Sequence, residues 1–224
     1  MELAELGTDS VATDQPSAHI HVVDDDAWVR KAIVRLLGAE GFTATAHRSA
    51  ESFLAASDLR QHGCLLLDVA LPGLDGLALQ QALAERGSHM PIIFVTGQAD
   101  VPMCAQAMKL GAFDFLTKPV DDTVLLAAID RALAKDLLLR RACRQRDATE
   151  SLLATLTPRE REVLTHVMAG RLNKQIAADL GTAEKTVKVH RARGMEKMQV
   201  HSVAELVRIV ERAHFQRRGP DVGG

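Results

Sequence analysis

Short apolar runs alternate with helical patterns over the first 120 residues, and this alternation limits the chain to few folds. The strand-like runs are HIHVV (19–23), CLLLD (64–68) and PIIFVT (91–96), with weaker ones at 43–47 and 113–116. Continuous apolar character is typical of strands buried on both faces. Helical patterns lie between them at 28–40, 50–57, 76–86 and 102–110. The order predicts an α/β domain with a doubly wound, five-stranded parallel sheet, whose ligands bind at the carboxyl ends of the strands.

Length and charge indicate a second domain of different character. A chain of 224 residues is typical of two domains. Residues 1–121 hold eight Lys and Arg against sixteen Asp and Glu, whereas residues 122–224 hold nineteen against thirteen. The acidic half favours a cation or metal ligand, and the basic half favours a polyanion such as nucleic acid.

Several classes of protein are excluded by composition. No apolar run approaches the ~18 residues of a membrane span, so no membrane residence is expected. The first eighteen residues carry four acidic groups, no Lys or Arg and no apolar core of a secretory signal, so we expect a disordered tail and a cytoplasmic protein. Cys64, Cys104 and Cys143 lack CxxC spacing, which argues against disulfides and a zinc site.

The residues after Asp121 form a long helical pattern. Leu126, Ile129, Leu133 and Leu137 recur at helical spacing and predict a fifth helix that packs on the sheet. From residue 140 to residue 150 the apolar stripe fades and charged residues dominate. This part is interpreted as a solvated helical connector in preference to a disordered linker.

The last 70 residues show helix start and stop signals without strand patterns. Thr157, Pro158 and Glu160 form a capping box with Pro at the first helical position, and Gly170 ends that helix. The further expected caps are Asn173 before helix 174–180, Thr182 before helix 183–198 and Ser202 before helix 203–215. A short helix, a tight break at Gly181 and a longer basic helix predict an all-α helix-turn-helix domain.

Three carboxylates stand at predicted strand ends. Asp24 and Asp25 follow the first strand and Asp68 ends the third, so a parallel sheet would crowd them together. Their repulsion is relieved by a hard divalent cation, and Mg²⁺ fits best because it leaves room for phosphate oxygens. Thr96 ends the fourth strand and Lys118 follows the fifth. The set provides a carboxylate nucleophile, a metal and two donors for phosphoryl oxygens.

At these residues the chain resembles the receiver domain of two-component response regulators, a flavodoxin-like fold. The matching strings are HVVDDDAWVRKA (21–32), LLLDVALPGLDG (65–76) and FVTGQADVPMCAQAMKLGAFDFLTKP (94–119). The resemblance implies that Asp68 is the phosphoacceptor and that Asp24, Asp25, Asp68 and the Ala70 carbonyl bind the metal. It also implies that Thr96 and Phe115 are switch residues and that Lys118, before a cis Pro119, binds phosphate and acts in catalysis with Asp68 and Thr96.

The segment LTPREREVLTHVMAGRLNKQIAADLGTAEKTVKVH (156–190) is similar to the LuxR-type helix-turn-helix, and both halves together resemble the FixJ/NarL group. The expected DNA contacts are Lys185, Thr186, Lys188, Val189, His190, Ala192, Arg193 and Lys197. Gly194 departs from the family, which usually places a branched apolar residue there. The glycine is expected to cost about 1 kcal/mol of helix propensity and some packing.

The resemblance implies a domain order and a function. The expected order is a disordered tail (1–18), the receiver domain (19–135), a helical linker (136–153), the LuxR-type domain (154–216) and a second tail (217–224). The implied function is transcription regulation: a sensor histidine kinase phosphorylates Asp68, and the protein then forms a homodimer and binds double-stranded DNA. Contact with RNA polymerase is compatible with this role. The chain would not be a classical enzyme, although the receiver catalyses its own phosphorylation and dephosphorylation.

Two rival functions use the same residues. A phosphotransferase or phosphatase of the HAD type also has a nucleophilic Asp at a strand end, but it requires a second acid two residues later, where Ala70 stands. A DNA-binding protein whose receiver serves only for dimerisation would never be phosphorylated at Asp68. Asp26, unlike Asp24 and Asp25, is expected only to cap the helix that follows it.

Overall fold

The computed structural model describes residues 18–59, 61–97 and 100–217, and the chain divides into two compact units, residues 1–139 and 140–224. The expected tails, 1–18 and 217–224, lie outside the described residues except for residues 18 and 217. Among the residues that are described, no helix is long and apolar enough to cross a membrane.

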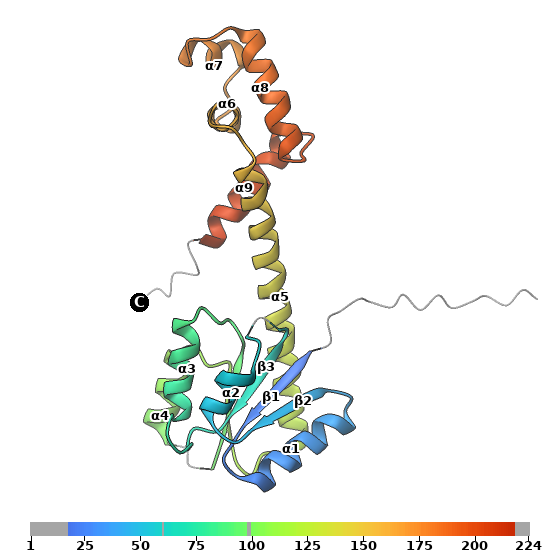
Figure 1. Ribbon diagram of the computed structural model, residues 1–224, viewed down its shortest axis with the longest axis vertical. Coiled ribbons are helices and arrows are strands. Elements are labelled where there is room, and N and C mark those ends of the chain that lie inside the picture. Colours follow the sequence, from blue (N-terminus) through green and yellow to red (C-terminus); the bar gives the residue numbers. More distant parts are fainter. Residues whose placement is uncertain (1–17, 60, 98–99, 218–224) are drawn as a thin grey trace, which may run out of the picture. The chain divides into compact units, whose positions relative to one another are not determined.

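The first unit is built on the expected five-stranded parallel sheet (Figure 1). Its strands are β1 (His19–Val23), β2 (Thr43–His47), β3 (Gly63–Leu67), β4 (Ile92–Thr96) and β5 (Asp114–Thr117). Their order across the sheet is β2-β1-β3-β4-β5, the doubly wound arrangement of flavodoxin-like folds. The fold prediction is confirmed, and β3, β4 and β5 each differ from the expected bounds by one residue.

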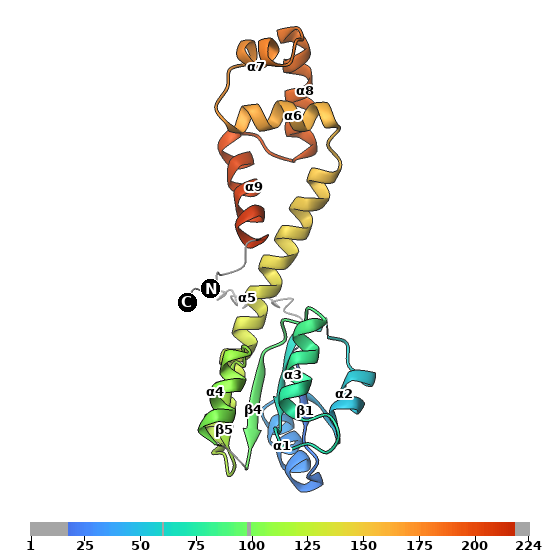
Figure 2. The same cartoon turned by 90° about the vertical axis from the view of Figure 1, so that its left-hand side faces the viewer.

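Helices cover both faces of this sheet (Figures 1 and 2). They are α1 (Ala27–Ala39), α2 (Ala50–Ala56), α3 (Gly76–Glu85), α4 (Val101–Lys109) and the first part of α5 (Asp122–Ala154). Apolar residues of α2, α3 and α4 pack with alternate strand residues such as Leu65, Leu67 and Phe94. Those of α1 and α5 pack on the other face, against Leu66 and Ile93 among others. Burial on both faces explains why the central strands read as continuous apolar runs.

Helix α5 continues without interruption for 33 residues to Ala154 and includes the segment interpreted as a helical connector. Within the first unit, α5 is held by a buried polar contact. The fully buried Asp136 carboxylate accepts hydrogen bonds from the His62 ring at 2.6 Å and from the Gly63 amide at 3.0 Å. This contact fixes α5 to the segment that enters β3.

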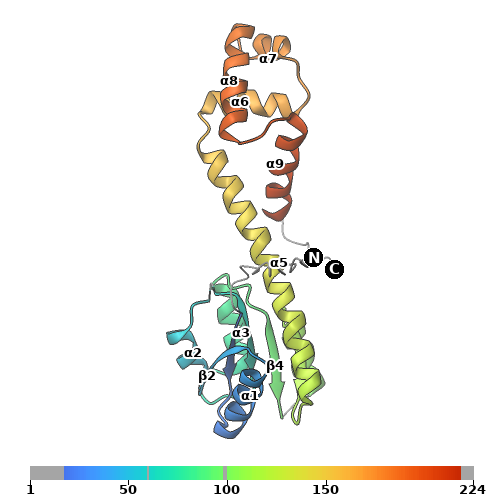
Figure 3. The ribbon, with the colours of Figure 1, turned by 90° about the vertical axis from the view of Figure 1, so that its right-hand side faces the viewer.

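The second unit comprises the end of α5 and four shorter helices, and Figure 3 shows α6 crossing α8. The helices are α6 (Pro158–Met168), α7 (Asn173–Asp179), α8 (Glu184–Lys197) and α9 (Val203–Arg217). The capping box of Thr157 and Glu160 forms as expected. Helices α7 and α8 form the helix-turn-helix.

Two predicted caps in this unit are wrong by one residue. Helix α7 begins at Asn173, and its N-cap is Leu172, whose amide is satisfied by the Gln175 side chain at 2.9 Å. The N-cap of α8 is Ala183, without a side-chain bond. The Thr182 amide donates to the Ala177 carbonyl at 3.0 Å, so Thr182 belongs to the turn that closes α7.

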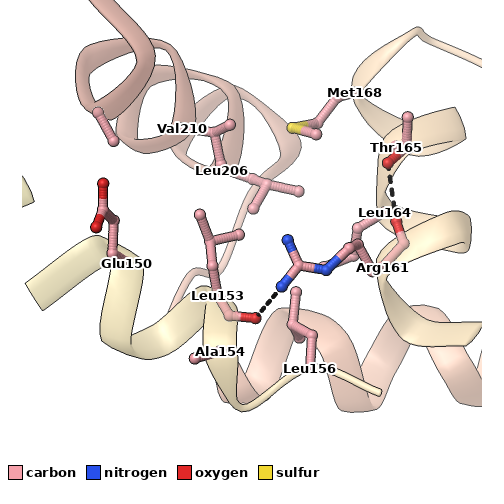
Figure 4. A pocket seen from close by; sticks show the side chains of 11 residues that line it. Glu150, Leu153, Ala154, Leu156, Arg161, Leu164, Thr165, Met168, Leu206 and Val210 are labelled. Atoms are coloured by element: carbon pink, nitrogen blue, oxygen red, sulfur yellow. Dashed lines mark hydrogen bonds between the residues drawn. The ribbon is translucent and has the colours of Figure 1, made fainter. Parts of the chain in front are cut away.

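A cavity of about 400 Å³ lies within the second unit, between the end of α5, α6 and α9 (Figure 4). Leu164 lines it and also packs against Gly194 of α8. A Cβ atom at Gly194 would lie 2.9 Å from Leu164 Cδ1. The packing defect expected at Gly194 is therefore not found, because Leu164 already fills the space.

Candidate functional site

The predicted acidic residues meet at the carboxyl edge of the sheet, where Figure 1 shows β1 leading into α1. Val23 and Leu67 are paired in the β1–β3 register, so the residues that follow them, Asp24 and Asp68, are brought side by side. Carboxylate oxygens of Asp24, Asp25 and Asp68 lie within 4.8 Å of one another. Asp24 and Asp68 are buried, whereas Asp25 is exposed.

Backbone groups hold the two buried carboxylates. Asp24 Oδ1 accepts a hydrogen bond from the Asp26 amide at 2.8 Å, and Asp68 Oδ1 accepts one from the Ala70 amide at 3.1 Å. Asp26 itself caps α1 by accepting from the Trp28 amide at 2.7 Å, as expected. The remaining oxygens, Asp24 Oδ2 and Asp68 Oδ2, point to a single cation.

That cation is Lys118, whose Nζ lies 2.6 Å from both Asp24 Oδ2 and Asp68 Oδ2. The β4–β5 pairing of Thr96 with Thr117 places Lys118 here, and the Lys118 amide donates to the Thr96 carbonyl at 2.8 Å. Burial raises the pKa of Asp24, and Lys118 opposes that effect. Burial disfavours the ammonium of Lys118, but its bonds to the two carboxylates raise its pKa overall. Lys118 therefore remains a cation and partly neutralises the acidic site.

The two predicted switch residues lie on neighbouring strands. Thr96, at the end of β4, is fully buried. Phe115 of β5 is half-buried, and its ring centroid lies 5.9 Å from that of Phe94. The Lys118–Pro119 peptide bond is cis, as the resemblance implied.

The donor set at this edge fits a magnesium ion. Mg²⁺ prefers hard oxygen ligands and is usually bound by one or two carboxylates together with phosphate and water oxygens. Asp24, Asp25 and Asp68 supply such oxygens, and Asp25 and Ala70 are exposed to solvent, which leaves a path for an ion to enter. The residues present can therefore hold the cation that the sequence suggested.

A second candidate site is the exposed face of α8 in the second unit. Lys185, Thr186, Lys188, Val189, Ala192 and Arg193 are all exposed. Val187, Gly194 and Met198 are buried on the opposite side of the helix. Val189 is an apolar residue that is 42% exposed. A face of cationic, small and apolar side chains on a helix can read the major groove of DNA.

Two predicted DNA contacts, Lys197 and His190, are less exposed than the others. Lys197 Nζ lies 2.6 Å from Glu160 Oε2 and donates to the Thr155 carbonyl at 3.2 Å. This ammonium and the Thr157 amide lower the pKa of Glu160 to about 2. His190 is half-buried, and its Nδ1 atom is buried without a hydrogen-bond partner among the described residues. The exposed part of the α8 face is therefore formed by the other six residues, and DNA contacts of Lys197 and His190 stay predictions.

Sequence reasoning missed the contribution of Arg30. Its NH1 group donates to the Asp24 carbonyl at 2.6 Å. The only sequence signal is its position six residues after Asp24, within the first turns of a helix that begins beside the site.

Comparisons with known proteins identify two matching domain families, one in each half of the chain. Residues 20–130 match the family model described as a response regulator receiver domain, and residues 154–210 match that of bacterial regulatory proteins of the luxR family. The chain is 44% identical to the transcriptional regulatory protein FixJ of Azorhizobium caulinodans, over 86% of this chain and 92% of the relative. It is also 44% identical to nodulation protein W of Bradyrhizobium diazoefficiens, over 87% and 86% of the two chains.

Solved structures of response regulators are similar to this chain over most of its length. The structure of response regulator StyR is 43% identical and superposes with a TM-score of 0.82, covering 88% of this chain and 99% of that one. Full-length FixJ from B. japonicum is 39% identical with a TM-score of 0.55, covering 90% of this chain and 99% of that one.

Proposed function

The chain belongs to the response regulators of the FixJ type, with a receiver domain and a LuxR-type DNA-binding domain, and we propose that phosphorylation of Asp68 controls its binding to DNA. The observation that carries this proposal is the convergence of Asp24, Asp25 and Asp68 with the Lys118 ammonium at one sheet edge. Such an arrangement suits the transfer of a phosphoryl group to a carboxylate. As a cytoplasmic protein, it would receive that group from a sensor histidine kinase.

In the proposed reaction an Asp68 carboxylate oxygen attacks the phosphorus of a phosphohistidine. The new P–O bond forms as the P–N bond to the imidazole breaks, and the product is an aspartyl phosphate. The Ala70 amide orients Asp68, and Lys118 compensates the charge on the phosphoryl oxygens. Mg²⁺ bound by Asp24, Asp25, Asp68 and the Ala70 carbonyl would supply further charge neutralisation. Loss of the phosphoryl group to water returns the receiver to its starting state. The aspartyl phosphate would serve as a signal and not as a released product, so the protein would not be a classical enzyme.

The rival phosphotransferase of the HAD type is disfavoured by the residue at position 70. Ala70 is exposed and donates its amide to Asp68 Oδ1, but it has no carboxylate to protonate a leaving group. A receiver that serves only for dimerisation would have no use for the ammonium that bridges Asp24 and Asp68.

The phosphoacceptor is tested by labelling the full chain with a phosphodonor in the presence of Mg²⁺. Asp68→Asn should abolish incorporation, because the amide is not a nucleophile for phosphorus. Asp130→Asn, at an exposed acid of α5, is the matched control and should label like the wild type. Full incorporation into Asp68→Asn would exclude the assignment.

We further propose that α8 reads the major groove and that phosphorylated receivers pair to form a homodimer over two half-sites. Paired half-sites raise the effective concentration of the second recognition helix. Regulation of transcription in this way would also bring the protein near RNA polymerase.

Salt titrations of binding to an operator fragment separate the roles of two α8 residues. Lys188→Ala should weaken binding. It should also lower the salt slope, the dependence of log affinity on log salt concentration, by about one counterion per site. Val189→Ala should change the preferred sequence while the salt slope stays the same, because no charge is removed. Lys109→Ala, in the receiver, is the charge-matched control. A reduced salt slope in Val189→Ala with no change in sequence preference would contradict the assigned face.

A further inference from the structure

Arg30 is the one cation besides Lys118 that the described contacts join to the acidic edge. It lies one turn into α1, where its own amide donates to the Asp26 carbonyl at 3.1 Å. Its side chain runs back toward the start of the helix, as helical side chains do, and NH1 meets the Asp24 carbonyl at 2.6 Å. The guanidinium thus binds the backbone of the acidic loop, whereas Lys118 binds its carboxylates.

The carbonyl that Arg30 binds belongs to the peptide between Asp24 and Asp25. Because a peptide is planar, fixing its C=O direction also fixes its N–H and the start of the next residue. Asp24 has other anchors, at its amide and at both carboxylate oxygens. The exposed Asp25 depends on this peptide for the direction in which its side chain leaves the backbone.

We propose that Arg30 is a positioning residue for the divalent cation, holding the Asp24–Asp25 peptide so that both carboxylates reach the ion. The inference rests on the proposed function, since it assumes that these acids bind Mg²⁺. Charge alone predicts the opposite behaviour: a guanidinium near the site repels a cation, so its removal should tighten metal binding. The sign of the change in affinity therefore separates positioning from charge.

The test measures metal binding to the full chain, independently of phosphorylation. Mn²⁺ affinity is obtained from the electron paramagnetic resonance signal of the free ion, and Mg²⁺ affinity from calorimetry. Arg30→Met keeps the length of the side chain and removes its donors. Residues that orient metal ligands typically change affinity by 10- to 100-fold, so we expect Kd to rise about tenfold or more for both ions. The Mg²⁺ concentration that gives half-maximal phosphorylation should rise by a similar factor.

The matched control is Arg35→Met, which removes the same charge from an exposed position on the same helix and should leave Kd within about twofold. Arg30→Lys keeps a charged donor and should recover part of the lost affinity. If thermal unfolding in EDTA shows that Arg30→Met does not fold, Arg30→Lys is used in its place. Unchanged or tighter binding in Arg30→Met, or in Arg30→Lys where that variant is used, would overturn the inference. Failure of the wild-type chain to bind either ion would instead overturn the metal step of the proposed function.

Discussion

His21 and His47 form a buried pair of imidazoles on the sheet face that α2 covers. His21 Nδ1 lies 3.3 Å from His47 Nε2 and 3.4 Å from Ser57 Oγ, and both rings contact Phe53 edge to face. Burial, with smaller contributions from His19 and His47, lowers the pKa of His21 to about 4. Burial also lowers the pKa of His47. The pair is therefore stable as neutral rings.

This pair predicts a loss of stability at mildly acid pH. Since the folded pKa of His21 lies below the unfolded value of 6.5, its contribution is complete above pH 6.5 and declines as the pH falls toward 4. Between pH 7.5 and pH 5.0 the wild type should lose about 2 kcal/mol of unfolding free energy to this residue. His21→Leu should lose correspondingly less, as measured by urea unfolding at the two pH values.

His89→Gln, at an exposed histidine, is the control and should follow the wild type. Acidic groups titrate in all three proteins, so their effects cancel in the comparison. An identical pH dependence in His21→Leu and the wild type would show that the buried ring is not the cause.

Single residues show where sequence reasoning succeeds and where it stops. Asp24, Asp25, Asp68 and Lys118 could be predicted together because strand ends in a parallel sheet converge. The partners of Lys197 and Arg30 could not be predicted, because Lys197 reaches Glu160 on another helix and Arg30 folds back to a backbone carbonyl before its own helix. Lys197 has the spacing of a DNA contact, yet Glu160 captures it from α6.

Among the elements, α8 contains a glycine, Gly194, which is unfavourable within a helix. Gly194→Ala should stabilise the protein by roughly 0.5–1 kcal/mol, because alanine loses less backbone entropy on folding. The added Cβ would press on Leu164, but that side chain ends beside the cavity of Figure 4 and can shift into it. Urea unfolding of the full chain measures the change.

Gly170→Ala provides the contrasting control, because Gly170 has a φ of 76° at the end of α6. The backbone there favours glycine, so alanine should destabilise by about 1 kcal/mol. If Gly194→Ala destabilises as much as Gly170→Ala, Leu164 is held too firmly to use the cavity.

The elements also show a limit of local sequence signals. All five strands and the first cap of the second unit followed from apolar periodicity and the Thr157 capping box. The caps of α7 and α8 did not follow from local signals. The Gln175 side chain binds the Leu172 amide at the start of α7, and Thr182 belongs to the turn that closes α7. A polar residue near a helix start has several possible acceptors and donors, and tertiary structure selects among them.

For the whole molecule, each compact unit has its own apolar core. If the receiver controls DNA binding, the isolated unit 140–224 should bind operator DNA equally with and without a phosphodonor. The full chain should bind tightly only when phosphorylated. Equal operator affinity of the two full-length forms, at one fixed salt concentration, would refute the coupling but not the DNA-binding assignment.

The unbroken course of α5 has a consequence for proteolysis. Arg140, Arg141, Arg144 and Arg146 are all sites for trypsin, and all lie within this helix. A protease needs an extended substrate, so cleavage there must wait for local unfolding of α5. Ala142→Gly weakens the helix by about 1 kcal/mol and should speed this cleavage about fivefold. The rate at which trypsin cuts the chain among these arginines would thus measure how firmly α5 stays helical in solution.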